Sequence, residues 1–333
     1  MPDLIRHPEI GSLKMEQLSF FTKCELCPRA CRVDRTLPNA ERKAFCGQSS
    51  QLRVSHIGPH HGEEPPISGS RGSGTIFFSG CSLRCTFCQN HQISMEGMGD
   101  IITPEEFYNK TARMIDTYDI HNINFVTPDH FFPYTFELVE RLRENNYTTP
   151  VLYNSSGYQS IELLKVAEKF ADIYMPDYKY SDSEIAQKFS RCKDYPQKAL
   201  DAIVEMVRQK GFLDSYEKGT DVATKGVLVR HLILPGKIEN SINALNSLFL
   251  EFGANIPISL MSQYHPVIKH DDNDMNRFLT LDEFEAVYSH AVDLGFKNMF
   301  VQFPAGFARN NLEESEFLPD FNVESPFKGN RDK

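Results

Sequence analysis

Short apolar runs with few polar interruptions recur along the chain from about residue 75 to residue 302. Runs of this kind are typical of strands that are buried on both faces. They predict strands over 75–78, 122–126, 151–153, 172–175, 227–234 and 258–264, with another short strand around 299–302.

The segments between these runs carry apolar residues at helical spacing. One helix has a clear start, because Thr103 is a capping residue and Pro104 suits the first helical position. Serial alternation of strand and helix implies a parallel sheet with helices outside, so we predict an α/β fold. About six repeats suit a partial (β/α)6 TIM-like barrel as well as an open doubly wound sheet. The expected helices span 104–118, 134–145, 161–169, 197–210, 241–252 and 281–294.

The 333 residues, 41% of them hydrophobic, are enough for one barrel-type domain or for two smaller domains. The start of the chain lacks the alternation and is rich in Cys, Arg, Pro and His. We therefore predict a cysteine-rich N-terminal extension over 1–70 and a core domain over 71–305. A polar, loosely ordered tail over 306–333 is expected to lie over the barrel.

The formal net charge of −10 provides no basic stripe for a phosphate backbone, so nucleic acid is not an expected partner. No apolar run approaches the ~20 residues of a membrane span, and the start of the chain lacks the apolar region of a signal peptide. These features predict a cytoplasmic protein with no membrane partner.

Seven of the eight cysteines lie between Cys24 and Cys88, and Cys192 stands apart. Disulfide frameworks belong mainly to short secreted domains, so this clustering favours metal or cluster ligation. For Cys192 a buried spectator thiol is the expectation, and a role in relaying a radical is the alternative.

Three cysteines, Cys81, Cys85 and Cys88, directly follow the first expected strand of the alternation. A 4Fe-4S cluster normally takes four thiolates, so three leave one iron with an open position. Catalytic metal sites keep such a position, and parallel sheets bind ligands beyond the carboxyl ends of their strands. The alternative is a structural zinc site that takes a fourth ligand, such as His91.

Two further groups of residues have ligand chemistry. Cys24, Cys27, Cys31 and Cys46 offer four thiolates, which suit either tetrahedral zinc or an auxiliary 4Fe-4S cluster, and the spacing leaves both open. The string HIGPHHGEEPP could bind a metal or contact a substrate, but its Gly and Pro residues are typical of a polar loop. Its candidate residues are His56, His60, His61, Glu63 and Glu64.

The spacing Cys81-x3-Cys85-x2-Cys88, with Phe87 before the third cysteine, resembles the signature of the radical S-adenosylmethionine (SAM) superfamily. The wider segment 63–94 and the string CELCPRACRVDR resemble uncharacterised iron-sulfur proteins related to pyruvate formate-lyase activating enzyme. This resemblance implies a 4Fe-4S cluster that cleaves SAM reductively to methionine and a 5′-deoxyadenosyl radical.

The same resemblance implies a one-electron donor such as flavodoxin or ferredoxin, and a glycyl radical enzyme as the protein to be activated. Another peptide or a small molecule is the alternative substrate. The competing class is a non-catalytic iron-sulfur protein that transfers electrons or binds a ligand, although such a protein rarely needs a barrel around one open iron.

Further residues carry over from the family by position. The stretch FVTPDHFFP takes the place of the family's Gly-Gly-Glu segment that holds the SAM amino group, so Asp129 or the backbone is expected to serve there. In YNSSGY, Asn154 occupies the acidic place of the family's Asp-Thr-Asn-Gly segment. Asp177 and His265 are expected near the ribose, and Lys179 near the SAM carboxylate. The alternative for each is an ordinary polar residue at a strand end, and this alternative weighs most for the lower-ranked candidates Arg230 and His231.

Overall fold

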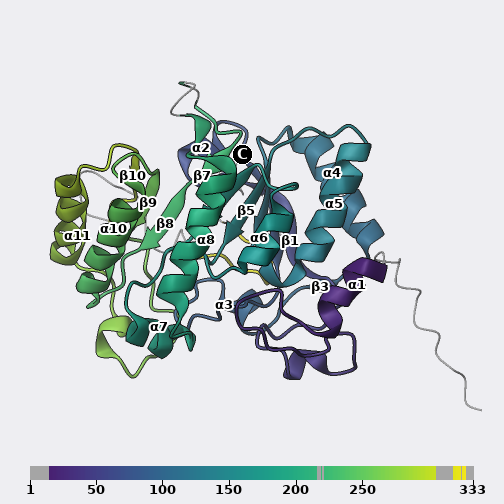
Figure 1. The fold of residues 1–333 in the computed structure, drawn as a ribbon, viewed down its shortest axis with the longest axis horizontal. Coiled ribbons are helices and arrows are strands. Elements are labelled where there is room, and N and C mark those ends of the chain that lie inside the picture. Colours follow the sequence, from purple (N-terminus) through teal and green to yellow (C-terminus); the bar gives the residue numbers. More distant parts are fainter. Residues whose placement is uncertain (1–14, 216–218, 220, 305–317, 324, 328–333) are drawn as a thin grey trace, which may run out of the picture.

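The computed structural model describes residues 15–215, 219, 221–304, 318–323 and 325–327. Figure 1 shows helices packed around a central, mostly parallel sheet. The strands form two sheets, one with seven strands in the order β3-β1-β2-β4-β5-β6-β7 and one with three in the order β10-β9-β8. The fold is therefore α/β, as predicted.

The seven-stranded sheet contains the first half of the alternation. Its strands β2, β4, β5, β6 and β7 pair in parallel, whereas β1 pairs antiparallel with β2 and with β3. The bounds are β1 Arg53–His60, β2 Ser73–Phe78, β3 Asp100–Ile101, β4 Ile123–Val126, β5 Val151–Ser155, β6 Ile173–Pro176 and β7 Gly226–Val227.

The three-stranded sheet contains the strands that follow β7 in the chain, and they pair in parallel. Their bounds are β8 Val229–Leu232, β9 Ile258–Met261 and β10 Met299–Val301. An isolated bridge between Asp177 and Arg230 connects the two sheets. Among the described residues no pairing joins β10 to β1 or β2, so the strands form an open, partial barrel.

The helices cover the outer face of the strands. Residues Ile76, Phe125 and Tyr153 point outward into the main apolar core, together with side chains of the surrounding helices. Two helices begin with a full capping box, which explains their sharp starts. The main helices are α4 Pro104–Tyr118, α5 Phe132–Glu144, α6 Ile161–Ala167, α7 Ser183–Ser190, α8 Tyr195–Lys210, α10 Ile238–Phe252 and α11 Leu281–Leu294.

The inner face of the strands has an apolar floor and a polar upper layer. Leu152, Ile173 and Met175 form a separate apolar cluster with Ile67 and Leu228, which fills the inner face. Polar side chains replace apolar ones toward the carboxyl ends of the same strands, where Asn154 and Asp177 follow. The strand ends that a parallel α/β sheet uses for ligands are therefore the polar ones.

Several expected bounds differ from the structure. The expected strand 227–234 is interrupted at Leu228, and the strand expected to reach residue 264 ends at Met261. The interpretation of HIGPHHGEEPP as a loop was wrong over its first part, because His56 and His60 lie in β1. Backbone pairing with β2 supplies the hydrogen bonds that the Gly and Pro residues do not predict.

The two ends of the described chain both contact the core. Strand β1 belongs to the expected 1–70 extension but pairs with β2 along its length. Of the expected tail, residues 318–323 and 325–327 are described, and the rings of Phe321 and Phe327 lie 5.4 and 5.3 Å from that of Phe77. The division into three segments at residues 70 and 305 stays a prediction.

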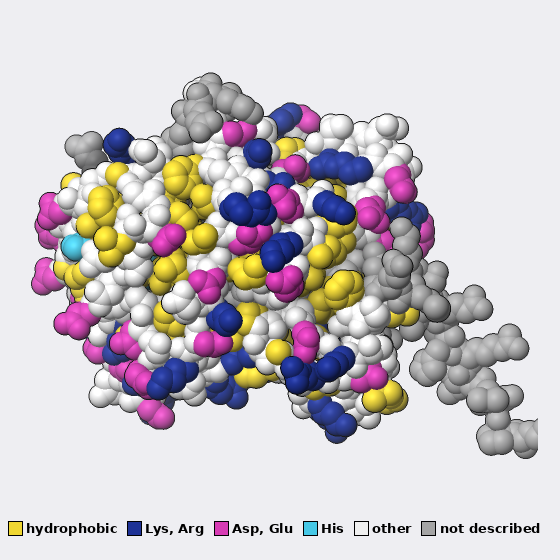
Figure 2. Space-filling model, viewed as in Figure 1, with side chains coloured by type: hydrophobic (Ala, Val, Ile, Leu, Met, Phe, Trp, Pro, Cys, Tyr) yellow, Lys and Arg dark blue, Asp and Glu magenta, His cyan; other side chains and the backbone are white. Residues whose placement is uncertain are grey.

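Within the described part of the chain, no helix combines the length and the apolar character that crossing a membrane requires. Figure 2 shows basic and acidic side chains interspersed on one face, with no continuous basic stripe there.

Candidate active site

The loop after β2 brings Cys81, Cys85 and Cys88 together. Burial raises the pKa of the Cys81 thiol, and the neighbouring Cys85 and Cys88 raise it further. Sulfur atoms of this loop accept hydrogen bonds: the Leu83 N–H donates to Cys81 Sγ at 3.3 Å, and the Ser190 hydroxyl donates to Cys85 Sγ at 3.1 Å. Such bonds stabilise thiolate sulfur, which is the form that binds metal.

Two side chains hold this cysteine loop from outside. The Arg29 guanidinium donates to the carbonyl of Ser82 at 3.1 Å and to that of Ser190 at 2.6 Å. The carboxylate of Asp129 accepts from the Ser82 hydroxyl at 3.0 Å and from the Gln159 amide. Burial raises the pKa of Asp129 to about 7, against these hydrogen bonds. Asp129 therefore contacts the cysteine loop directly.

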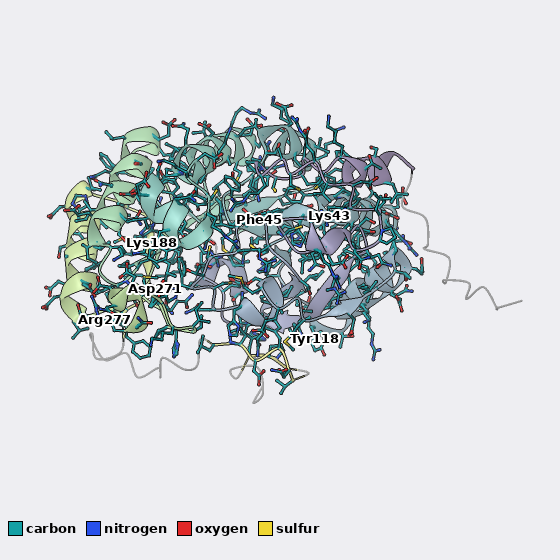
Figure 3. All side chains as sticks on the ribbon, turned by 90° about the horizontal axis from the view of Figure 1, so that it is seen from below. Lys43, Phe45, Tyr118, Lys188, Asp271 and Arg277 are labelled. Atoms are coloured by element: carbon teal, nitrogen blue, oxygen red, sulfur yellow. The ribbon has the colours of Figure 1, made fainter. Side chains whose placement is uncertain are left out.

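The N-terminal cysteines lie beside the same loop. The Cys81 N–H donates to the carbonyl of Cys46 at 3.3 Å. Gly80 permits this approach, because it has φ +81 and a Cβ there would lie 2.5 Å from the Cys46 carbonyl oxygen. The two cysteine groups, far apart in the sequence, are therefore neighbours in space. Figure 3 labels Phe45, which precedes Cys46.

Arg230 is the centre of a buried polar network on the inner face. Its Nε lies 3.0 Å from Asp177 Oδ1, and its Nη2 donates to Asn154 Oδ1 at 2.6 Å. Its Nη1 lies 3.6 Å from Glu63 Oε2. Glu63 also accepts from the Asn124 amide at 2.9 Å. The network thus joins β4, β5, β8 and the residue after the end of β6 with the segment that follows β1.

Lys179 connects this network to the cysteine loop. Its Nζ lies 2.6 Å from Asp177 Oδ2, and Cys85 is among the groups that raise its pKa against the effect of burial. Burial acts to raise the pKa of Asp177, but Arg230 and Lys179 hold it below its ordinary value. Asp177 is therefore an ionised carboxylate between two cations, at the edge of the cysteine site.

The candidate histidines occupy different places. His231 faces outward, where its Nδ1 lies 2.6 Å from the Tyr178 carbonyl and its Nε2 lies 2.9 Å from the Ser241 hydroxyl. His265 packs edge-on against Phe278. His91, the alternative zinc ligand, pairs with Glu96 at 2.8 Å on the surface. None of these three joins the Arg230 network in the described contacts.

The histidines of β1 pack against aromatic rings. The His60 ring centroid lies 4.1 Å from that of Phe327, and that of His56 lies 6.4 Å from that of Phe77. Burial lowers the pKa of both imidazoles to about 4. At neutral pH these side chains are therefore uncharged and belong to the contact between β1, β2 and the segment around Phe327.

Among the described residues, no group of three or more His, Cys, Asp or Glu side chains is placed to hold a single metal ion. A 4Fe-4S cluster makes a different demand, because each cysteine binds a separate iron of the cube. The three cysteines after β2 fit such a cluster through their burial, their mutual proximity and their hydrogen-bonded sulfurs.

Sequence reasoning missed the residues that support the cysteines. Arg29 and Arg35 stood out only as an excess of arginine in CPRACRVDR, a pattern with no specific meaning. Ser190 lies more than one hundred positions from Cys85 and gave no signal at all. Arg230 was ranked low, although the structure places it at the centre of the polar network.

Residues 75–244 of the chain match the radical SAM superfamily. Over 299 residues the chain is 26% identical to the uncharacterized protein MJ0674 of Methanocaldococcus jannaschii, and this alignment covers 84% of this chain and 77% of that protein.

Two solved structures resemble the fold at low sequence identity. One is Streptococcus suis SuiB bound to S-adenosylmethionine, with 10% identity and a TM-score of 0.45 over 71% of this chain. The match covers 52% of SuiB, so this chain spans about half the length of that protein. The other is methylornithine synthase, PylB, with 15% identity and a TM-score of 0.43 over 91% of each chain.

Proposed function

This chain belongs to the radical SAM superfamily, and we propose that it cleaves SAM reductively at a 4Fe-4S cluster held by Cys81, Cys85 and Cys88. Membership of the superfamily implies an enzyme that uses such a cluster and SAM. When bound, these two groups supply one electron and a sulfonium that breaks into methionine and a 5′-deoxyadenosyl radical, which removes hydrogen from a substrate. The protein holds, orients and shields them.

The observation that carries this proposal is the group of three neighbouring thiols at the carboxyl end of β2, of which Cys81 and Cys85 are buried and Cys88 is half-buried. Ser190 and the Leu83 amide donate to two of the sulfurs, and Arg29 fixes the loop that carries them. The protein's own hydrogen bonds thus hold the loop and its ligands in place, and such preorganisation reduces the entropy lost when a ligand binds.

Lys179 is proposed to bind the SAM carboxylate. It is the cation whose electrostatic neighbours include Cys85, and its ammonium is already oriented by Asp177 at 2.6 Å. Asp177 and Asn154 are the proposed partners of the ribose hydroxyls, and His265 stays a prediction. For Asp129 we propose a positioning role, because its carboxylate accepts hydrogen bonds from Ser82, in the cysteine loop, and from Gln159.

The substrate has two candidates, each with its own support. Activation of a glycyl radical enzyme is supported by the resemblance of segment 63–94 to activating enzymes. A backbone glycine of the partner would then be the hydrogen donor. The test is electron paramagnetic resonance (EPR) of a candidate glycyl radical enzyme mixed with this protein, SAM and a reductant. A glycyl radical signal supports activation, and its absence with every candidate tested counts against it.

A small polar molecule is the second candidate, favoured by the inner-face network. Glu64 Oε2 and Asn124 Oδ1 are buried and have no hydrogen-bond partner among the described residues. Both atoms are acceptors, so amino or hydroxyl groups of a substrate would satisfy them. A backbone glycine needs no buried carboxylates of this kind. This candidate predicts that Glu64→Gln abolishes the stimulation of turnover by an amine or polyol substrate and leaves uncoupled SAM cleavage intact.

The decisive experiment for the reaction class is product analysis. The protein is reconstituted with iron and sulfide without oxygen, reduced with dithionite and given SAM. We expect 5′-deoxyadenosine and methionine in equal amounts. An intact, reduced cluster that yields neither product would favour the competing class, an iron-sulfur protein that only transfers electrons or binds a ligand.

A low-potential one-electron donor of the flavodoxin or ferredoxin class is the proposed source of electrons in the cell, and we propose a cytoplasmic location. Both follow from the chemistry, because a reduced 4Fe-4S cluster and free thiols require a reducing compartment. Replacement of dithionite by reduced flavodoxin or reduced ferredoxin tests the donor. Failure of both proteins to support turnover, in a preparation that turns over with dithionite, would argue against this class of donor.

A further inference from the structure

Arg35 is a buried cation that has no carboxylate partner among the described residues. Its side chain is fully buried, with 0% exposure. Nε donates to the Gln48 carbonyl at 3.1 Å, Nη2 to the Ser49 carbonyl at 2.7 Å and Nη1 to the His130 carbonyl at 2.7 Å. These carbonyls accept from three of the five N–H donors but supply no negative charge, and an uncompensated buried charge is strongly unfavourable.

The groups that can supply this charge are the N-terminal thiols. Arg35 Nη1 lies 3.7 Å from Cys24 Sγ, and Cys46 and Cys27 are among the groups that act on the guanidinium electrostatically. A neutral thiol supplies no negative charge to the guanidinium. Metal-bound cysteines are thiolates and would balance the cation.

The backbone around these cysteines is folded into one compact unit. The Cys24 N–H donates to the Val33 carbonyl and the Arg32 N–H to the Cys24 carbonyl, which closes a loop around Cys27 and Cys31. Arg35 joins this loop to the segment after Cys46 through its bonds to the Gln48 and Ser49 carbonyls. Arg35 and the four cysteines thereby belong to one folded unit, in which Cys24 and Cys46 are buried and Cys27 and Cys31 are half-buried.

We propose that Cys24, Cys27, Cys31 and Cys46 hold a second 4Fe-4S cluster and that Arg35 is its buried counter-cation. Four cysteines complete the ligand set of such a cluster, so this site has no open iron and binds no SAM. The hydrogen bond from Cys81 N–H to the Cys46 carbonyl places it directly beside the first cysteine group. A redox centre in this position could exchange electrons with a cluster at the first cysteine group, whereas zinc has no redox chemistry.

Metal content tests the site without reference to SAM cleavage. The reconstituted full chain should hold about eight irons and eight sulfides. The Cys81→Ala/Cys85→Ala/Cys88→Ala variant and the Cys27→Ala/Cys31→Ala variant should each retain about four irons. Wild-type protein with about four irons, whether with one bound zinc or with none, would overturn the proposal. Failure of SAM cleavage in a protein with eight irons would instead contradict only the proposed reaction.

Arg35→Met tests the counter-cation, and Arg32→Met is the matched control. Arg32 also lies among these cysteines, but its side chain is exposed and pairs with Glu25. Loss of Arg35 should shift the second cluster to a lower reduction potential, because a positive charge near the sulfurs stabilises the reduced state. The chelator concentration that removes half of this cluster should fall on the order of tenfold to a hundredfold.

Arg35→Lys should restore most of the potential, because it restores the charge. A purely structural arginine would give a different result: Arg35→Met would lower the unfolding temperature but leave the potential of the remaining folded protein at the value of the Arg32→Met control. That outcome would overturn the role of Arg35.

Discussion

The two cysteine groups lie side by side but differ in how their nearest cation is paired. Beside Cys85, Lys179 forms an ion pair with Asp177, which also binds Arg230. Beside Cys24, Arg35 bonds to carbonyls and to sulfur and lies over the rings of Phe21 and Phe131, with no carboxylate partner among the described residues. The first group has three thiols and the second has four. The difference supports the proposed open site with an exchangeable charge pair, next to a proposed closed site whose own ligands would balance the cation.

An exchangeable pair is what an anionic ligand requires. Lys179 can shift its ammonium from Asp177 to an incoming carboxylate while Arg230 keeps Asp177 paired. Arg35 cannot shift in this way, since it is fully buried and its bonds join three separate segments. The two sites therefore differ not only in the number of cysteines but also in whether the cation beside the cysteines can change its partner. We expect an exchangeable cation at a site for chemistry and a fixed cation at a site for structure or electron storage.

The largest expected effect distinguishes the cysteines themselves. Cys85→Ala should abolish 5′-deoxyadenosine formation, because it removes one of three cluster ligands. The matched control is Cys192→Ala, since Cys192 is a buried thiol that contacts Asp194 at 3.4 Å and belongs to neither group. It should retain nearly full activity in the same product assay. Turnover by Cys85→Ala, or its loss in Cys192→Ala alone, would contradict the assignment.

The next effect concerns the charge pairing on the inner face. Arg230→Met should destabilise the protein by about 3–5 kcal/mol, because it leaves Glu63 without its cation and Asp177 with Lys179 alone. Chemical denaturation of the two proteins measures the difference. Arg143→Met is the control, since its pair with Asp172 lies near the surface and should contribute little. Equal effects of the two changes would argue against a buried network.

A smaller effect is expected for the exchangeable cation. Lys179→Met should weaken SAM binding about tenfold to a hundredfold, as expected for the loss of one charge-assisted hydrogen bond. Equilibrium binding of SAM to the reconstituted protein measures this change. Lys188→Met serves as the control, because Lys188 lies on α7 and pairs with Asp272 at 2.8 Å, away from the network. An unchanged dissociation constant for Lys179→Met would remove Lys179 from the site.

The smallest expected effect concerns His231, which lies on the opposite face of β8 from Arg230. Burial lowers the pKa of His231 from 6.5 to about 4, so the folded protein keeps this imidazole neutral while the unfolded chain takes up a proton. Stability from this group is therefore present above pH 6.5 and is lost as the pH falls toward 4. His231→Gln should reduce the pH dependence of unfolding between pH 6 and 5 by about 1 kcal/mol. SAM affinity should not change, and a change would place His231 in the site.

The helices of the strand–helix alternation were predicted well from the sequence. Helices α4 and α11 have the expected bounds, because Thr103 and Thr280 each begin a capping box that is local in sequence. Strand β1 was missed, since its Gly58 and Pro59 oppose strand propensity and only pairing with β2 makes it a strand. Patterns that are local in sequence, such as a capping box, therefore predict helices better than they predict an antiparallel strand such as β1.

The candidate site was predictable only where its residues follow strands. Asn154 and Asp177 were expected at strand ends, and the structure brings both to Arg230. The contact from Arg35 to the His130 carbonyl joins residues 95 positions apart, and no sequence pattern encodes such a distance. The supporting arginines are therefore a product of tertiary packing, and only the structure reveals them.

The most direct test of the central claim is the EPR spectrum of the dithionite-reduced protein before and after addition of SAM. It is best recorded on the Cys27→Ala/Cys31→Ala variant, in which the signal arises from the cluster at Cys81, Cys85 and Cys88. An altered signal on addition of SAM, followed by 5′-deoxyadenosine, is the expected result. A reduced cluster whose spectrum does not change when SAM is added would contradict the claim that this site has an open iron.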